Sequence, residues 1–145
     1  MLRVVIDTNI FVSALLSKTG APAQVIDAWQ SRKFLVITSD AAILEVERVL
    51  KELATTGKFT ISDEEIKSVI NLLQKDALLV SGRTEAIGAV PEDPDDENFL
   101  SIALEGEAKI IISGDKHLLG LATYRNISIQ TAREFINSLK LDTSK

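Results

Sequence analysis

The sequence contains no cysteine, which excludes disulfide bonds and thiolate metal sites in this chain of 145 residues. A chain without disulfide bonds is compatible with the reducing cytosol, and we expect a cytoplasmic protein. No apolar run approaches the roughly 20 residues that a membrane-spanning helix needs, so we expect no membrane partner. The amino-terminal stretch MLRVVIDTN does not predict a signal peptide, because its apolar run is short and ends in Asp7.

Basic residues are fewer than acidic residues, 16 against 21, and the formal net charge is −5. This balance argues against a protein that grips nucleic acid with a broad basic surface. It is compatible with acids gathered around divalent cations, because the cations then compensate the carboxylates. The chain also lacks a glycine-rich turn after its first predicted strand, which argues against dinucleotide binding.

Strand-like and helix-like patterns alternate along the chain. Strands are predicted at residues 3–6, 34–39, 77–81, 109–113 and 127–129, with amphipathic or apolar helices between them and a closing helix at 131–140. This alternation predicts an α/β fold, a three-layer α/β/α sandwich around a mainly parallel five-stranded sheet. We expect one domain over residues 1–140 and a frayed tail over 141–145.

Two of the predicted strands are followed by an aspartate, namely Asp7 after VVI and Asp115 after IIISG. Either residue alone is well explained as a helix N-cap, because aspartate is among the best capping residues. In a parallel sheet, however, both would lie at the same carboxyl edge, where ligands of such folds bind. The pair therefore leaves two interpretations, helix caps or one wall of a site.

Asp96 lies in the acidic stretch EDPDDENFLSIALEG, at the start of a predicted helix. The positions three, four and seven residues after it are Phe99, Leu100 and Ala103, all apolar. Asp96 is therefore predicted to face the sheet, whereas Asp95 is predicted to face solvent. An inward carboxylate is unfavourable unless it is paired or bound to metal, so Asp96 is the strongest single indication of a site.

A third source of acids is the helix predicted at residues 40–53, whose buried stripe runs through Ile43, Val46 and Leu50. Glu45 borders this stripe on one side and Glu47 on the other, and periodicity does not choose between them. Aspartate and glutamate without cysteine, and with His117 as the sole histidine, favour hard cations such as Mg²⁺ or Mn²⁺. Such cations activate water and assist displacement at phosphorus.

Three segments together resemble a PIN domain: VVIDTNIFVSALL, ILEVERVL and DPDDENFLSIALEGEAKIIISGDKHLL. They cover nearly the whole chain in order, and they are most similar to the VapC-like branch of prokaryotic PIN proteins, the toxins of toxin–antitoxin pairs. The resemblance implies a sheet of strand order 3-2-1-4-5. It also implies a metal-dependent ribonuclease that cuts single-stranded RNA and leaves 5′-phosphate and 3′-hydroxyl ends.

The resemblance places the family's four acids on Asp7, Glu45, Asp96 and Asp115, and its supporting polar positions on Asn9 and Ser113. By this correspondence Asp7, Asp96 and Asp115 would hold Mg²⁺ or Mn²⁺, and Glu45 would orient or deprotonate the attacking water. His117 stands where an acid is common, and a turn or packing role is expected for it. The family also implies a homodimer and an antitoxin protein as partners.

Two other classes remain as alternatives. One is a PIN-like binding or assembly module without catalysis. The other is a phosphoryl-transfer enzyme of haloacid-dehalogenase or response-regulator type, which also places an aspartate at a strand end. The dehalogenase pattern needs a second aspartate two residues after Asp7, where this chain has Asn9. Failure to bind Mn²⁺ would favour the module, and phosphatase activity without nuclease activity would favour the phosphoryl-transfer class.

Overall fold

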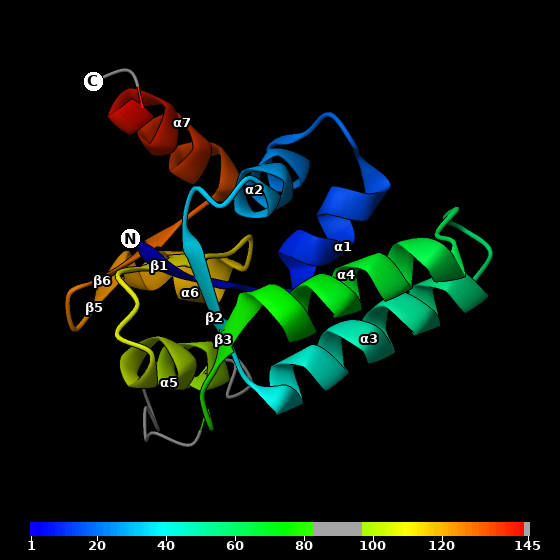
Figure 1. Ribbon diagram of the computed structural model, residues 1–145, viewed down its shortest axis with the longest axis horizontal. Coiled ribbons are helices and arrows are strands. Elements are labelled where there is room, and N and C mark those ends of the chain that lie inside the picture. The colour runs from blue at the N-terminus through cyan, green and yellow to red at the C-terminus, as the bar shows by residue number, and fades with distance from the viewer. Residues whose placement is uncertain (83–96, 144–145) are drawn as a thin grey trace.

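The computed structural model describes residues 1–82 and 97–143, and its centre is a mostly parallel sheet (Figure 1). The sheet has the order β3-β2-β1-β4-β6-β5. Its strands are β1 (Arg3–Ile6), β2 (Leu35–Thr38), β3 (Ala77–Leu79), β4 (Ile110–Ile112), β5 (Thr123–Tyr124) and β6 (Ile127–Gln130). All neighbours are parallel except β5 and β6. The predicted α/β fold and the order of the first four strands are confirmed.

The central strands are buried on both faces, which explains why their sequences are continuous apolar runs. In β1, Val4 and Ile6 pack into one hydrophobic cluster, whereas Val5 packs into another on the opposite face. The same alternation occurs in β4, where Ile112 joins the first cluster and Ile111 the second. The sheet therefore separates two cores.

Helices cover both faces of the sheet and complete the three-layer sandwich. The first core is built with side chains of α1 (Thr8–Leu16), α2 (Ala21–Gln30), α3 (Asp40–Thr55), α4 (Asp63–Asp76) and α7 (Ala132–Thr143). The second core is built with α5 (Glu97–Glu105) and α6 (Lys116–Leu121). Trp29 belongs to the first core and is 3% exposed, so packing accounts for it. Within the two described ranges, no helix is long and apolar enough to cross a bilayer.

Two details differ from the sequence prediction. The sheet has six strands, because Thr123–Tyr124 pairs antiparallel with the last predicted strand. Arg125 and Asn126 form the two-residue turn of this hairpin, and both have positive φ, 47° and 69°. The usual Asn-Gly or Asp-Gly signal of such a turn is missing, which explains why the short strand was not predicted. In addition, α7 continues to Thr143, past the expected start of a frayed tail at Leu141.

The position of β1 decides where the loops at the sheet's carboxyl edge converge. β1 lies between β2 and β4, with Val5 opposite both Ile37 and Ile111. The chain leaves β1 through α1 and α2 on one face, and it enters β4 from α5 on the other face. The strand order therefore reverses between β1 and β4, and the residues that follow these two strands lie side by side.

Candidate active site

Asp7 is held at the junction of β1 and α1. Its backbone N–H donates to the carbonyl of Ile112, 3.0 Å away, and so continues the pairing with β4. Its carboxylate is the N-cap of α1 and accepts the N–H of Asn9 at 3.5 Å. The capping interpretation is therefore correct for Asp7. Capping alone does not account for Asp7, because the residue is only 4% exposed and other acids lie near it.

Ser113 joins the acid after β1 to the acid after β4. This serine is fully buried, and its Oγ–H donates to Asp7 Oδ2 at 2.7 Å. The same oxygen accepts the N–H of Asp115 at 2.9 Å. The Asp115 carboxylate in turn caps α6, since its Oδ1 accepts the N–H groups of His117 and Leu118 at 2.7 and 3.3 Å. One hydroxyl thus fixes both aspartates relative to each other.

The structure places Glu45, and not Glu47, beside this pair. Thr8 Oγ1 donates to Glu45 Oε2 at 3.3 Å, and Arg48 Nη2 lies 3.8 Å from Glu45 Oε1. Glu47 instead pairs with Lys51 Nζ at 3.5 Å, one turn along the same helix. Thr8 was not among the site residues predicted from the sequence. Its place directly after Asp7, at the strand's carboxyl end, is the signal that would have identified it.

The electrostatics of Asp7 follow from this arrangement. Burial raises the pKa of the Asp7 carboxyl above its ordinary value of 3.8. The hydrogen bonds from Ser113 and from the Asn9 N–H oppose this rise, while the negative charges of Asp115 and Glu45 add to it. Asp7 is therefore a buried acid next to two other acids, which is an unfavourable arrangement unless a cation compensates it.

The other predicted residues are distributed as follows. Asp96, and with it Asp95, lies outside the described residues. Asn9 approaches Asp7 through its backbone N–H, and the residue is exposed. His117 is half-buried at the start of α6, where its backbone N–H donates to the capping carboxylate of Asp115.

The donors around Asp7 fit a hard cation in kind, because they are carboxylate and hydroxyl oxygens with no thiolate. Among the described residues alone, no group of three acids or histidines is placed closely enough to hold a metal ion. Asp7, Glu45 and Asp115 thus supply a charged, partly buried wall. A complete ligand set would need at least one ligand beyond these three residues.

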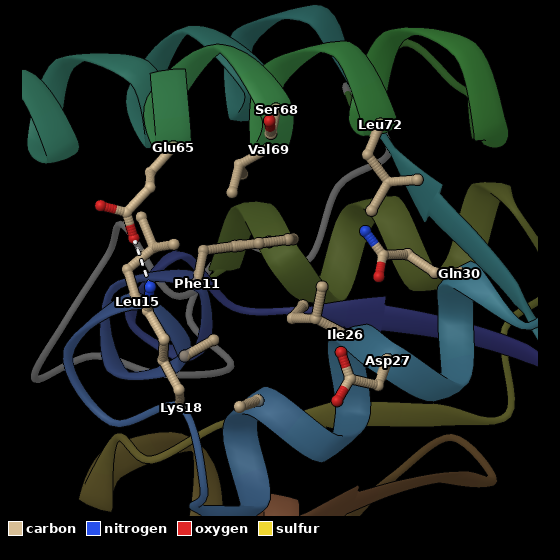
Figure 2. A pocket seen from close by; sticks show the side chains of 12 residues that line it. Phe11, Leu15, Lys18, Ile26, Asp27, Gln30, Glu65, Ser68, Val69 and Leu72 are labelled. Atoms are coloured by element: carbon tan, nitrogen blue, oxygen red, sulfur yellow. Dashed lines mark ion pairs between the residues drawn. The ribbon is translucent and has the colours of Figure 1, made fainter. Parts of the chain in front are cut away.

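A separate hollow lies away from this edge, between α1, α2 and α4 (Figure 2). Phe11, Ile26, Val69 and Leu72 make its surface largely apolar. At its rim Lys18 Nζ pairs with Glu65 Oε2 at 3.4 Å, the contact drawn as a dashed line. This cleft lacks the converging carboxylates of the strand edge, so the acidic edge is the better candidate for catalysis.

Comparisons with known proteins bear on the whole chain. The family model for the PIN domain matches residues 3–117. An uncharacterized protein of Methanocaldococcus jannaschii is 28% identical over 148 aligned positions, which cover 96% of this chain and 92% of that protein.

Two solved structures have the same fold. PAE2754 from Pyrobaculum aerophilum superposes with a TM-score of 0.62 at 11% identity, covering 97% of this chain and 90% of its own. A chain of VapBC2 from Rickettsia felis, solved with a DNA fragment from the promoter, superposes with a TM-score of 0.57 at 11% identity, covering 90% and 98%. The fold, the aspartates after β1 and β4, and the family match agree: this chain belongs to the PIN domain family.

Proposed function

We propose that the protein is a metal-dependent endoribonuclease that hydrolyses single-stranded RNA in the cytoplasm. The observation that carries the proposal is the buried Asp7, whose pKa is raised and which is flanked by Asp115 and Glu45 at the carboxyl edge of the sheet. PIN domains are generally nucleases that use divalent metal ions, which supports this use of the acids. The relatives support the family and the fold, and the RNA substrate is our inference.

In this proposal each residue has a distinct part. Asp7, Asp115 and Asp96 hold Mg²⁺ or Mn²⁺, directly or through water. A divalent cation bound there would supply charge neutralisation at the phosphate and make water a stronger nucleophile. Ser113 keeps the two strand-end aspartates in register, and Asn9 supports the turn that carries Asp7.

Glu45 acts on the attacking water. Its carboxylate is oriented by Thr8 and Arg48, and it accepts a proton as water attacks phosphorus. The bond from phosphorus to the ribose 3′-oxygen breaks, so that one product carries a 5′-phosphate and the other a 3′-hydroxyl.

The test is cleavage of an end-labelled single-stranded RNA in Mg²⁺, Mn²⁺ or EDTA. Each site variant has a matched neighbour as control: Glu45→Gln against Glu47→Gln, and Asp96→Asn against Asp95→Asn. We expect E45Q and D96N to lower the rate by about 100-fold or more, since general-base and metal contributions are of this size. E47Q and D95N should retain the wild-type rate, because Glu47 pairs with Lys51 instead of Thr8 and Asp95 is predicted from the sequence to face solvent.

Binding of Mn²⁺ by calorimetry, with thermal unfolding as a check on folding, separates the alternatives. D96N should weaken Mn²⁺ binding while D95N should not. A wild-type protein that neither binds Mn²⁺ nor cuts RNA would be a binding module. A protein that binds Mn²⁺ and hydrolyses phosphomonoesters, but not RNA, would belong to the phosphoryl-transfer class.

We further propose that the protein is the toxin of a toxin–antitoxin pair and forms a homodimer. One of the solved structures with this fold is part of a VapBC2 assembly, which supports an antitoxin partner. Growth arrest on expression, relieved by a neighbouring gene and abolished in E45Q, would support the toxin role. Light scattering of the purified chain measures the dimer.

A further inference from the structure

A pocket of about 260 Å³ opens beside Glu45. It is lined from four places in the chain: the turn after β2, the first turns of α3, the turn after β3 and the first turns of α5. The lining residues are Ser39, Ala41, Ala42, Glu45, Ser81, Gly82, Asn98, Phe99 and Ile102. Because β2 and β3 both end there, the pocket lies at the same carboxyl edge as the acids.

Glu45 connects the pocket to the acidic site. This carboxylate is part of the pocket lining, and its Oε2 also accepts the hydroxyl of Thr8, the residue next to Asp7. An RNA whose phosphate lies at Asp7 and Asp115 would therefore place a neighbouring nucleotide at the mouth of this pocket. Since Glu45 borders both the pocket and the acidic edge, a single strand of RNA is able to reach both.

The chemistry of the lining selects the part of the nucleotide that fits. Among the lining residues that the structure describes, Glu45 is the one that ionises, and it is an acid, so a phosphate group is disfavoured. Phe99 and Ile102 form an apolar floor and are 6% and 1% exposed. The hydroxyls of Ser39 and Ser81 also line the pocket, but the first accepts the N–H of Ala42 and the second donates to Glu105, so the exposed Asn98 supplies the amide for a ligand. A small pocket with carbon atoms at its base and an exposed amide at Asn98 is suited to an uncharged, flat heterocycle.

Hydrogen bonds within the protein hold the pocket walls in place. Glu105 on α5 accepts the hydroxyl of Ser81 at 2.6 Å and the N–H of Gly82 at 2.8 Å, which ties the turn after β3 to α5. Gly82 has a φ of +72°, and a Cβ atom there would lie 3.3 Å from Ser39 Cβ and 3.5 Å from Ile102 Cγ1. Glycine thus allows the turn to approach α3 and α5 closely.

We propose that this pocket is a subsite for one unpaired nucleobase of the RNA, adjacent to the phosphate that is cut. The volume of the pocket agrees with a ligand as small as one nucleobase, since it falls just below the roughly 300–1,000 Å³ of pockets that enclose larger ligands. Single-stranded RNA is typically recognised through bases that are splayed out of the stack and held at their edges. The proposal rests on the proposed nuclease function, but its first test does not.

That first test is an NMR titration of the ¹⁵N-labelled protein in EDTA with adenosine, guanosine, cytidine and uridine. Nucleosides carry no phosphate, so they probe the pocket and not the metal-binding wall. We expect the backbone signals of Ala42, Gly82 and Asn98 to shift with at least one nucleoside at concentrations up to about 10 mM. Absence of any shift at these residues would overturn the subsite.

Two variants assign the shifts to the pocket. Ala42→Leu fills the pocket from α3 with a good helix former, and it should abolish the shifts. Ser68→Leu places the same side chain in the apolar cleft of Figure 2 and should leave them unchanged. Asn98→Ala, at an exposed position, removes an amide without straining the core and should weaken binding by about tenfold. Equal shifts in A42L and wild type would refute the assignment.

The second test is cleavage of RNA pools randomised around the cut. The wild type should prefer one base at one flanking position, and A42L should lose that preference with a roughly tenfold higher KM and a retained kcat. An active enzyme whose base preference is the same in A42L would overturn the subsite and leave the nuclease intact. Nucleoside binding by a protein that cuts no RNA would refute the nuclease and leave the pocket as a nucleoside site.

Discussion

At the scale of single residues, Asp7 performs two tasks that oppose each other energetically. As an N-cap it satisfies an N–H of α1, which stabilises the helix by about 1 kcal/mol. As a buried acid near Asp115 and Glu45 it resists ionisation, and its pKa is raised mainly by burial. Asparagine caps helices equally well but carries no charge. The substitution Asp7→Asn therefore isolates the electrostatic part.

We expect D7N to be more stable than the wild type at neutral pH in EDTA. The native Asp7 holds its proton above pH 3.8, where the unfolded chain releases it, so the native state binds more protons and its stability falls as pH rises. The advantage of D7N should thus be present above the native pKa and disappear as pH falls to 3.8 and below. Urea unfolding between pH 3.5 and 8 measures it. An advantage that grows toward acid pH would contradict the assignment.

At the scale of secondary-structure elements, α4 begins with a reciprocal capping box. Ser62 Oγ accepts the N–H of Glu65 at 3.1 Å, and Glu65 Oε1 accepts the N–H of Ser62 at 3.1 Å. The hydrogen bond from the Ser62 backbone is the main reason that the pKa of Glu65 is lowered. The motif lies within four consecutive residues, SDEE, so this helix start is predictable from the sequence alone.

Replacing Ser62 with alanine should destabilise the protein by about 1 kcal/mol at pH 7, since one N–H at the helix start loses its acceptor. Ser68→Ala, within the same helix and exposed, should leave the stability unchanged or raise it slightly. Urea unfolding at constant m-value measures both.

The Glu65 half of the box contributes above pH 4.5 and is lost as pH falls through the lowered pKa, so wild-type stability should decline there. Equal stability of S62A and S68A would rule out the capping role.

At the scale of the whole molecule, the fold depends on close contact between the sheet and the helices on each face. Gly106 follows α5 and lies against β2, where an added Cβ would overlap with Ile37 Cγ2. Arg3 Nη1 donates to the carbonyl of Gly106 at 2.9 Å and joins the same turn to β1. Glycine at this position lets the helix end approach the sheet, which places the following strand β4 beside β1.

Gly106→Ala should therefore destabilise the protein by about 1–3 kcal/mol, the usual range for overpacking a core. Gly120→Ala is the matched control, because the residue is within α6 and, apart from its chain neighbours and the helix backbone, no atom of the described residues lies within 4 Å of the Cβ it would add. We expect G120A to raise the stability by roughly 0.5–1 kcal/mol, since alanine favours the helix. Chemical unfolding of both variants measures the difference. A stability of G106A at or above that of the wild type would show that the contact is relieved by a shift of α5.

The class of fold and most of its helices and strands were predictable from the sequence alone, and so were acids after the first and fourth predicted strands. Strands were predictable because β1, β2 and β4 are buried on both faces and so appear as unbroken apolar runs. Helix starts were predictable at Asp7, Ser62 and Asp115 because capping is local. The short strand β5 escaped prediction, because its pairing depends on a turn without the usual glycine.

The contacts between side chains that are distant in the sequence are evident only from the tertiary structure. Glu45 and Glu47 border the same stripe of one helix, and the hydroxyl of Thr8, 37 residues away in the chain, distinguishes them. Ser113 bonds to Asp7 across 106 residues, which turns two helix caps into one buried acidic wall. Such contacts depend on strand order and on the register of β1 with β4, for example Ile6 opposite Ile112. Local periodicity carries no information about that register, so the sequence indicated the acids and the fold brought them together.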